Sequence, residues 1–181
     1  MSEDTSSLPI LLNLGSGQRP FPHPWINVDA QDRYNPDVVA DLSDSETWEE
    51  IKEAYPSGVD VICLHHTLEH FGLMEGKELV ERCYSVLKPR GRLWVFVPDL
   101  KALAQSYVQG KLDHYQFAVN MYGAYMGAEW DRHRWGYDTM HLGRMLVGAG
   151  CRHVGMWNSG QEKWGADIAQ DWWILGMEGM K

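Results

Sequence analysis

Short apolar segments alternate along most of the chain with segments of helical periodicity. Seven of the apolar segments have the length and the β-branched or aromatic content of buried strands. They lie at 10–14, 26–29, 38–40, 59–64, 93–97, 153–157 and 172–177, and helical patterns lie at 46–54, 75–87, 100–109, 113–122 and 139–149. This alternation is typical of a parallel sheet whose strands are connected by helices.

The order of these elements predicts an α/β fold with a Rossmann-like, doubly wound and mostly parallel sheet of seven strands. Only residues 158–171 separate the last two strands, which favours a hairpin and therefore an antiparallel C-terminal strand. A chain of 181 residues is long enough for one hydrophobic core. We expect a flexible tail at 1–9 and a single domain over 10–181.

Local signals define two of the connections. Ser43 and Glu46 have the spacing of a capping box before the first helical pattern. Between the first two strands, Pro20, Pro22 and Pro24 exclude a helix, because each proline removes a backbone donor and restricts the residue before it. We expect an extended loop in place of the usual first crossover helix.

The composition excludes several classes of protein. Sixteen basic against twenty-five acidic residues give a net charge of −9, which argues against nucleic-acid or membrane partners. No apolar run reaches the length of a membrane span, and residues 1–7 are too polar for a signal peptide. The three cysteines are widely spaced in apolar contexts, as is typical of reduced thiols in a cytoplasmic protein.

A glycine-containing loop follows the first strand, where α/β sheets bind ligands. Gly15 and Gly17 would let a ligand approach the backbone, and Asp29 at the end of the second strand could accept hydrogen bonds from ribose hydroxyls. A tight turn beside a surface aspartate is the simpler interpretation of the same residues.

The spacing of this loop favours one adenosine-containing cofactor over others. The dinucleotide fingerprint requires a third glycine at its sixth position and a helix whose dipole binds the pyrophosphate. Here Pro20 occupies that position and the prolines exclude the helix. No phosphate-binding P-loop motif occurs either. S-adenosylmethionine has no phosphate and needs no helix dipole, so the sequence favours it over NAD.

At this point the chain resembles the class I S-adenosylmethionine-dependent methyltransferases, in a small subgroup. The resemblance lies in LNLGSG (12–17), WINVD (25–29), DVVADL (37–42), VDVICLHHTLEHF (59–71), VLKPRGRLWVFVPDL (86–100) and HRWGYD (133–138). These stretches occur in family order. The chain departs from the family at Arg19, which replaces a glycine, and in the missing first helix.

The resemblance implies a set of cofactor-binding residues. Gly15, Ser16 and Gly17 would line the methionine moiety, and Asp29 would bind the ribose. Asp41 and the backbone of Leu42 would contact the adenine, and His65 would touch the cofactor after the fourth strand. The neighbouring residues Asn13, Leu14 and Ala30 complete the predicted set. Asp41 could instead be a solvated acid or a helix cap.

Residues 66–70 also match the His-x-x-Glu-His pattern of certain zinc proteases. The match lies at a strand end, and Phe71 and Gly72 interrupt any helix there. Some quinone O-methyltransferases carry a related Glu-x-x-Glu-His stretch, which leaves a weakly bound metal open. We expect no metal, and we expect Glu69 and His70 to orient the loop.

Two histidines are candidates for a general base. Methyl transfer to a hydroxyl requires removal of its proton, and histidine is suited to this near neutral pH. His66 follows the fourth strand and His133 lies in the insertion at 100–137, and either could instead be a packing histidine.

The insertion is rich in aromatic residues and would lie on the substrate side of the sheet. Aromatic faces suit a small organic acceptor, although these residues could simply pack two helices. They are Tyr107, Tyr115, Phe117, Tyr122, Tyr125, Trp130 and Trp135, accompanied by Met121 and Met126. A second aromatic group, Trp157, Trp164, Trp172 and Trp173, would form core or a homodimer contact.

Taken together, these features predict a methyltransferase that uses S-adenosylmethionine, releases S-adenosylhomocysteine and acts on a small organic acceptor. Oxygen is the favoured acceptor atom, because the chain lacks the Asn/Asp-Pro-Pro-Tyr motif of enzymes that methylate the amines of bases. A sugar or surface-polysaccharide precursor is suggested by the resemblance alone. The alternatives are a non-catalytic protein that binds S-adenosylmethionine or S-adenosylhomocysteine and, less favoured, a nicotinamide-dependent oxidoreductase.

Overall fold

In the computed structural model, residues 8–124, 129–168 and 171–181 are described, and they contain a seven-stranded sheet. The strands are β1 (Leu11–Leu14), β2 (Trp25–Asp29), β3 (Val38–Val39), β4 (Val59–His65), β5 (Leu87–Pro98), β6 (Arg152–Met156) and β7 (Ile174–Met180). Their order is β3-β2-β1-β4-β5-β7-β6; β7 pairs antiparallel with β5 and with β6, and the other neighbouring strands are parallel. The predicted fold, including the terminal hairpin, is confirmed.

Each of the five predicted helices is present, with ends within two residues of those expected. They are α1 (Ser45–Ala54), α2 (Leu73–Val86), α3 (Leu100–Val108), α4 (His114–Tyr122) and α5 (Thr139–Gly148). Three single-turn 3-10 helices are added: η1 (Asp32–Tyr34), η2 (Leu68–His70) and η3 (Glu129–Asp131).

The predicted capping box at α1 is wrong by one residue. Asp44 is the N-cap, and its side chain accepts a hydrogen bond from the backbone N–H of Glu46. The Ser43 hydroxyl is instead bonded to the carboxylate of Asp41, within the turn that precedes the helix. Because Asp41 engages this hydroxyl, the cap falls to the next polar residue.

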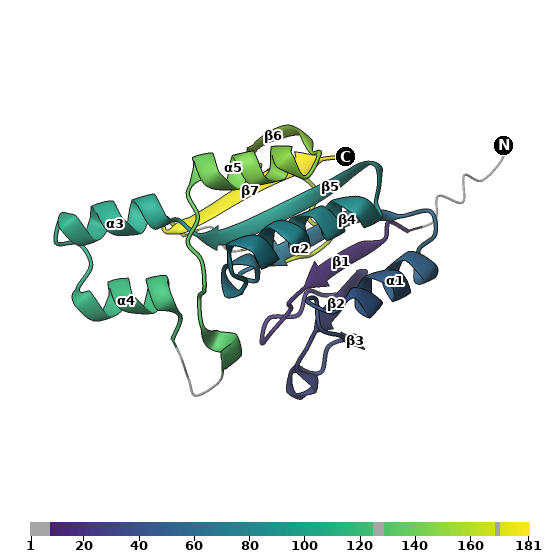
Figure 1. Cartoon of the computed structure of the whole chain (residues 1–181), viewed down its shortest axis with the longest axis horizontal. Coiled ribbons are helices and arrows are strands. Elements are labelled where there is room, and N and C mark those ends of the chain that lie inside the picture. Colours follow the sequence, from purple (N-terminus) through teal and green to yellow (C-terminus); the bar gives the residue numbers. More distant parts are fainter. Residues whose placement is uncertain (1–7, 125–128, 169–170) are drawn as a thin grey trace.

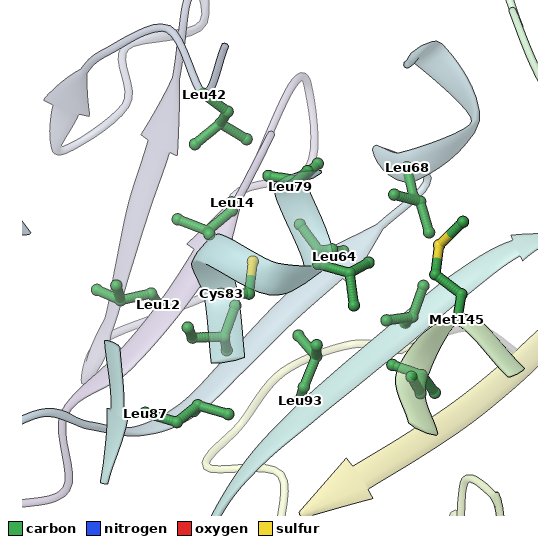
Figure 2. Packing of buried hydrophobic residues seen from close by; sticks show 14 of the residues in the cluster. Leu12, Leu14, Leu42, Leu64, Leu68, Leu79, Cys83, Leu87, Leu93 and Met145 are labelled. Atoms are coloured by element: carbon green, nitrogen blue, oxygen red, sulfur yellow. The ribbon is translucent and has the colours of Figure 1, made fainter. Parts of the chain in front are cut away.

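Three helices cover one face of the sheet. They are α1, α2 and α5, which lie side by side over the sheet (Figure 1). Alternate side chains of β1, β4 and β5 pack against these helices. Figure 2 shows part of this cluster, in which Leu12, Leu14, Leu64 and Leu93 from the strands meet Leu79 and Cys83 of α2. The alternation confirms the period-two pattern expected of buried strands.

The opposite face is covered differently. No helix in the described part of the chain packs there, and tryptophans from the strands and loops form a second core. Trp94 of β5 is fully buried, with its ring 5.8 Å from that of Trp25 and 5.7 Å from that of Trp157. Phe21, from the proline-containing loop between β1 and β2, packs against Trp25 at 5.2 Å. Large aromatic side chains therefore occupy the space that a first crossover helix would fill.

Strands β5 and β7 begin at other residues than expected. β5 extends back to Leu87, which pairs with Val59 of β4. The last strand starts at Ile174 instead of Trp172, because residues 171–174 form a turn in which the N–H of Ile174 donates a hydrogen bond to the carbonyl of Asp171. The Trp173 carbonyl accepts a hydrogen bond from the N–H of Asp99 just beyond the end of β5, so Trp173 lies at the edge of the sheet where the parallel strands end.

The strand order reverses between β1 and β4, which is where open α/β sheets bind ligands. Helices α3 and α4 extend away from the sheet beyond this edge (Figure 1). The chain then returns through η3 to Tyr137, which forms an isolated bridge with Asp99. This return segment, residues 129–137, therefore passes over the carboxyl edge of the sheet. No helix among the described residues is long and apolar enough to cross a membrane.

The tryptophan layer can be tested by truncation. We expect Trp94→Ala to lower the free energy of unfolding by about 3–5 kcal/mol, because it opens a large cavity in a fully buried cluster. Trp172→Ala is the matched control, because this side chain is 58% exposed and should change stability by less than about 0.5 kcal/mol. Urea unfolding followed by circular dichroism measures both, and equal midpoints would contradict the role assigned to the layer.

Candidate functional site

The glycine loop is held closely against the end of β4. Gly15 has a φ of +75°, and a Cβ atom there would lie 2.5 Å from the Cγ2 atom of Thr67. The Thr67 hydroxyl donates a hydrogen bond to the carbonyl of Leu14 at 2.8 Å. Gly17 also has a positive φ, +51°, but no atom lies within 4 Å of the position of its Cβ. Gly15 is therefore required for packing, whereas Gly17 borders open space.

Asp29 fixes the far side of the same loop. One carboxylate oxygen accepts a hydrogen bond from the N–H of Gly17 at 2.8 Å, and the other accepts one from the N–H of Gln31 at 2.8 Å. The side chain is buried, but it lines a cavity. Because each carboxylate oxygen has more than one lone pair, Asp29 can still accept hydrogen bonds from a ligand.

A first cavity of about 360 Å³ opens at the carboxyl edge of the sheet. The glycine loop and the end of β2 form one wall, the segment before α1 forms another, and the return segment of the insertion forms a third. This cavity brings together the predicted residues Gly15, Gly17, Asp29, Ala30, Asp41, Leu42 and His66.

A second cavity, of about 380 Å³, also borders the glycine loop. Gly15, Gly17 and His66 line both cavities, so the two meet at these residues. The predicted residues Ser16 and His65 line the second cavity, together with Gln18, Arg19, Asp171, Trp173 and Ile174.

The sequence analysis missed Trp173 as a site residue. Its ring lies 5.4 Å from that of His66, whereas we had expected core or a dimer contact. An antiparallel last strand must begin at the edge where the parallel strands end, so the expected hairpin could have indicated this position.

Two predicted cofactor contacts, Asn13 and Leu14, line neither cavity. Both side chains are buried within β1. The Asn13 amide donates a hydrogen bond to the side chain of Asn27 at 2.9 Å. These residues therefore support the glycine loop from within the strand that precedes it, and their side chains do not reach the cavities.

His66 is held by a buried carboxylate. Its Nδ1 atom lies 3.0 Å from Oε1 of Glu69, and Glu69 is only 1% exposed. When the carboxylate is ionised, Nδ1 donates the proton and Nε2 keeps its lone pair. The φ of His66 is +57°, in the left-handed region that a non-glycine residue adopts at a cost of about 1–2 kcal/mol. Strained residues of this kind are found at functional sites.

The pKa of Glu69 is lowered in spite of its burial. Desolvation raises this pKa, but the hydrogen bond from His66 and, when the histidines are protonated, the charges of His66, His70 and His133 outweigh it. The Glu69 carbonyl also accepts hydrogen bonds from the N–H groups of Arg134, at 2.7 Å, and Trp135, at 3.2 Å. Glu69 therefore orients the loop, as expected, and also contacts a candidate catalytic side chain.

The second candidate base, His133, lines neither cavity. Its Nδ1 atom lies 3.0 Å from the carbonyl oxygen of Asn120, and its ring lies 5.0 Å from that of His70. Burial lowers the pKa of His133, so its neutral form is favoured at neutral pH. The geometry thus separates the two histidines, because only His66 reaches the cavities.

The aromatic residues of the insertion contribute little to the cavity walls. Trp130 lines the first cavity, but Tyr107 and Phe117 stack on each other between α3 and α4, and Tyr115 and Tyr122 are exposed. Tyr125 and Met126 lie outside the described residues. The wall is formed instead by the return segment, through Glu129, Asp131 and Arg134.

Comparison with known proteins identifies the fold. No sequence family matches the chain, and no curated protein is significantly similar to it in sequence. Among solved structures, a methyltransferase from Archaeoglobus fulgidus that depends on S-adenosylmethionine matches with a TM-score of 0.60 and 16% identity, over 96% of this chain and 86% of that one.

Two further methyltransferases match over 96% of this chain. One is a member of an O-methyltransferase family from Burkholderia thailandensis, with a TM-score of 0.56, 14% identity and 51% of its length covered. The other, from the same organism, is 1,6-didemethyltoxoflavin-N1-methyltransferase with bound S-adenosylhomocysteine, with a TM-score of 0.54, 16% identity and 71% of its length covered. The chain thus spans about half the length of the O-methyltransferase. It has the fold of methyltransferases that use S-adenosylmethionine.

The two glycines should differ in their effect on stability. Gly17→Ala should cost about 1–2 kcal/mol for the left-handed backbone alone, whereas Gly15→Ala should cost about 2–4 kcal/mol because its Cβ also overlaps Thr67. Thr67→Ala in the same chain should reduce the cost of Gly15→Ala. Urea midpoints measure all three, and equal costs at Gly15 and Gly17 would contradict the packing assigned to the loop.

Proposed function

We propose that this chain is an S-adenosylmethionine-dependent methyltransferase that transfers a methyl group to a hydroxyl of a small organic acceptor. The observation that carries this proposal is the His66–Glu69 pair at the junction of the two cavities, beside the glycine loop. A binding protein needs no general base there, whereas a hydroxyl acceptor must lose a proton during methylation.

The first cavity fits the nucleoside part of the cofactor. The Asp29 carboxylate, already oriented by two backbone N–H groups, would accept hydrogen bonds from the ribose hydroxyls. Asp41 and Leu42, on another wall of the same cavity, would contact the adenine. The methionine part would lie along Gly15, Ser16 and Gly17, close to His66. Asn13 and Leu14 would then act by supporting the loop.

S-adenosylmethionine supplies an activated methyl group on its sulfonium centre. The chain's own residues would align the acceptor hydroxyl, and alignment alone contributes much of the rate in a displacement of this kind. His66 would accept the hydroxyl proton at Nε2, because Glu69 holds the proton on Nδ1. The buried carboxylate of Glu69 would stabilise the imidazolium that forms.

The second cavity supports a polar, hydroxyl-bearing acceptor. Gln18, Arg19 and Asp171 offer donors and acceptors of hydrogen bonds, and Trp173 offers an aromatic face beside His66. Sugars bind through this combination of polar groups and an aromatic face, so a sugar or surface-polysaccharide precursor is the acceptor class that we favour. The fold itself does not distinguish oxygen from nitrogen as the acceptor atom, because an N1-methyltransferase has the same fold.

The main rival is a protein that binds the cofactor without transferring its methyl group. The missing crossover helix favours this rival, because the loop that replaces it could hold the methionine part differently. A turnover screen with methyl-labelled S-adenosylmethionine and sugar, phenol and amine acceptors separates the two.

The buried, free cysteines Cys63, Cys83 and Cys151 fit an enzyme of the reducing cytoplasm.

Asp29 should be the main polar anchor of the cofactor. Asp29→Ala removes the carboxylate that would bind the ribose and also releases the N–H of Gly17. We expect S-adenosylhomocysteine to bind about 10- to 150-fold more weakly, which corresponds to about 1.5–3 kcal/mol. Asp32→Ala, on the exposed turn that follows, is the matched control. Isothermal titration calorimetry measures the affinities, and unchanged binding to folded Asp29→Ala would refute the assignment.

His66→Gln should lower turnover by about 100- to 10,000-fold with little loss of cofactor affinity, because only the general base is removed. His114→Gln, on the exposed start of α4, is the control for stability and activity. Full turnover in folded His66→Gln would refute the role of His66 as the general base and would leave alignment of the acceptor as the source of catalysis.

A further inference from the structure

Three side chains of the kind that bind metal ions lie close together where η2 meets the return segment of the insertion, next to His66. One ligand atom each of Glu69, His70 and His133 lies within 4.8 Å of the other two. Glu69 and His70 belong to η2, and His133 follows η3 after more than sixty residues of intervening chain. The cluster therefore joins the end of β4 to the insertion.

The buried carboxylate of Glu69 has one oxygen without a partner. Oε1 is bonded to His66, but Oε2 is fully buried and no hydrogen-bond partner is found for it among the described residues. A buried carboxylate oxygen without a partner is costly, and in native proteins it points to an ion or an ordered water. The oxygen belongs to the same side chain that forms the cluster with the two histidines.

Both histidines are oriented as metal ligands commonly are. The Nδ1 atom of His70 lies 3.0 Å from the carbonyl oxygen of Arg132, and that of His133 lies 3.0 Å from the carbonyl oxygen of Asn120. A carbonyl only accepts hydrogen bonds, so each Nδ1 must carry the proton. Each Nε2 then keeps its lone pair, and a backbone carbonyl bonded to Nδ1 is the usual outer-shell partner of a metal-bound histidine.

We propose that Glu69, His70 and His133 form a binding site for a divalent transition metal, with Zn²⁺ as the ion that the site favours. Two imidazole nitrogens and one carboxylate oxygen suit Zn²⁺, whereas Mg²⁺ prefers ligands that are all oxygen. Three protein ligands leave a fourth position of a tetrahedral centre open. Zinc-ligand bonds of about 2.0–2.2 Å would draw the three atoms closer together than they lie without the ion.

This site is not the one that the His-x-x-Glu-His pattern suggested. In that pattern the two histidines 66 and 70 would share the metal, but here Nδ1 of His66 is bonded to Glu69. The third ligand is His133, which the sequence places far from the pattern. Our expectation that the chain holds no metal is therefore replaced by this proposal.

A metal here would connect the site to its wall. His133 lies between Asp131 and Arg134, which line the first cavity, and His70 lines the same cavity. Coordination would hold the return segment against η2, in addition to the two hydrogen bonds that the Glu69 carbonyl accepts. Glu69 would then connect the metal, through its other oxygen, to the proposed base His66. The ion would have a positioning role.

Metal binding can be measured without reference to turnover. The purified full chain, stripped with a chelator, is titrated with Zn²⁺ in competition with a chromophoric chelator, and Co²⁺ is added separately for its visible absorption. We expect one Zn²⁺ per chain, a higher melting temperature in Zn²⁺ than in chelator, and a Co²⁺ spectrum of a four-coordinate centre.

The variants assign the ligands. His70→Gln and His133→Gln should each weaken Zn²⁺ binding at least about 10-fold, since even changes in the outer shell of a metal site cost about 10- to 100-fold. His114→Gln, in the same insertion but outside the cluster, should bind Zn²⁺ as the parent does. Binding of S-adenosylhomocysteine by the stripped chain reports separately on the proposed function.

Three results would overturn the proposal: no stoichiometric Zn²⁺ in the parent, equal Zn²⁺ affinity in the parent and His133→Gln, or a melting temperature unchanged by Zn²⁺. If a variant fails to fold, the parent's Co²⁺ spectrum decides, because the site is refuted if four-coordinate absorption is absent. An ordered water at Oε2 of Glu69, in place of a metal, would give these negative results.

Discussion

The burial of one carboxylate constrains the carboxyl edge of the sheet in this molecule. Glu69 is 1% exposed, and its charge must be compensated by the groups that surround it. His66, His70 and His133, when protonated, lower the pKa of this carboxylate. The backbone carbonyl of Glu69 accepts hydrogen bonds from two N–H groups of the return segment. The end of β4, the candidate base and the wall of the first cavity therefore all depend on Glu69. Removal of the carboxylate would affect each of them at once.

A second constraint comes from the short connection between β1 and β2. Without a crossover helix, this connection contributes Phe21 to the second core, and tryptophans fill the remaining space. The loop gains its rigidity from specific contacts: Gly15 against Thr67, and Gly17 to Asp29. These contacts hold the glycines in place at the junction of the two cavities.

Much of the fold could be predicted from the sequence, because hydrophobic periodicity and proline positions act locally. The seven strands, the terminal hairpin and the absence of a first helix all follow from such signals. The capping residue of α1 could not be chosen from spacing, because Ser43 and Asp44 compete and the bond of Ser43 to Asp41 decides. Likewise, Asn13 and Leu14 belong to a motif that resembles a binding loop, but both faces of β1 are covered, so these two side chains, which point to opposite faces, are both buried.

The site was predictable where it follows the ends of strands and unpredictable where it depends on long-range contacts. Asp29, Asp41 and His66 lie after strands, and the structure brings them to one cavity. The partnership of Glu69 with His133 joins residues far apart in the sequence, and no local pattern indicates it. Trp173 lines the second cavity because it directly precedes the antiparallel last strand, a position that the expected hairpin could have indicated.

The central claim is that the glycine loop, Asp29 and His66 form one methyl-transfer site. A crystal structure of the chain with S-adenosylhomocysteine tests it most directly. We expect the ribose hydroxyls to contact Asp29, the adenine to lie beside Asp41 and Leu42, and the sulfur to face the imidazole of His66 across the junction of the two cavities. A ligand bound elsewhere, or a sulfur atom separated from His66 by protein, would show that these residues do not form one site.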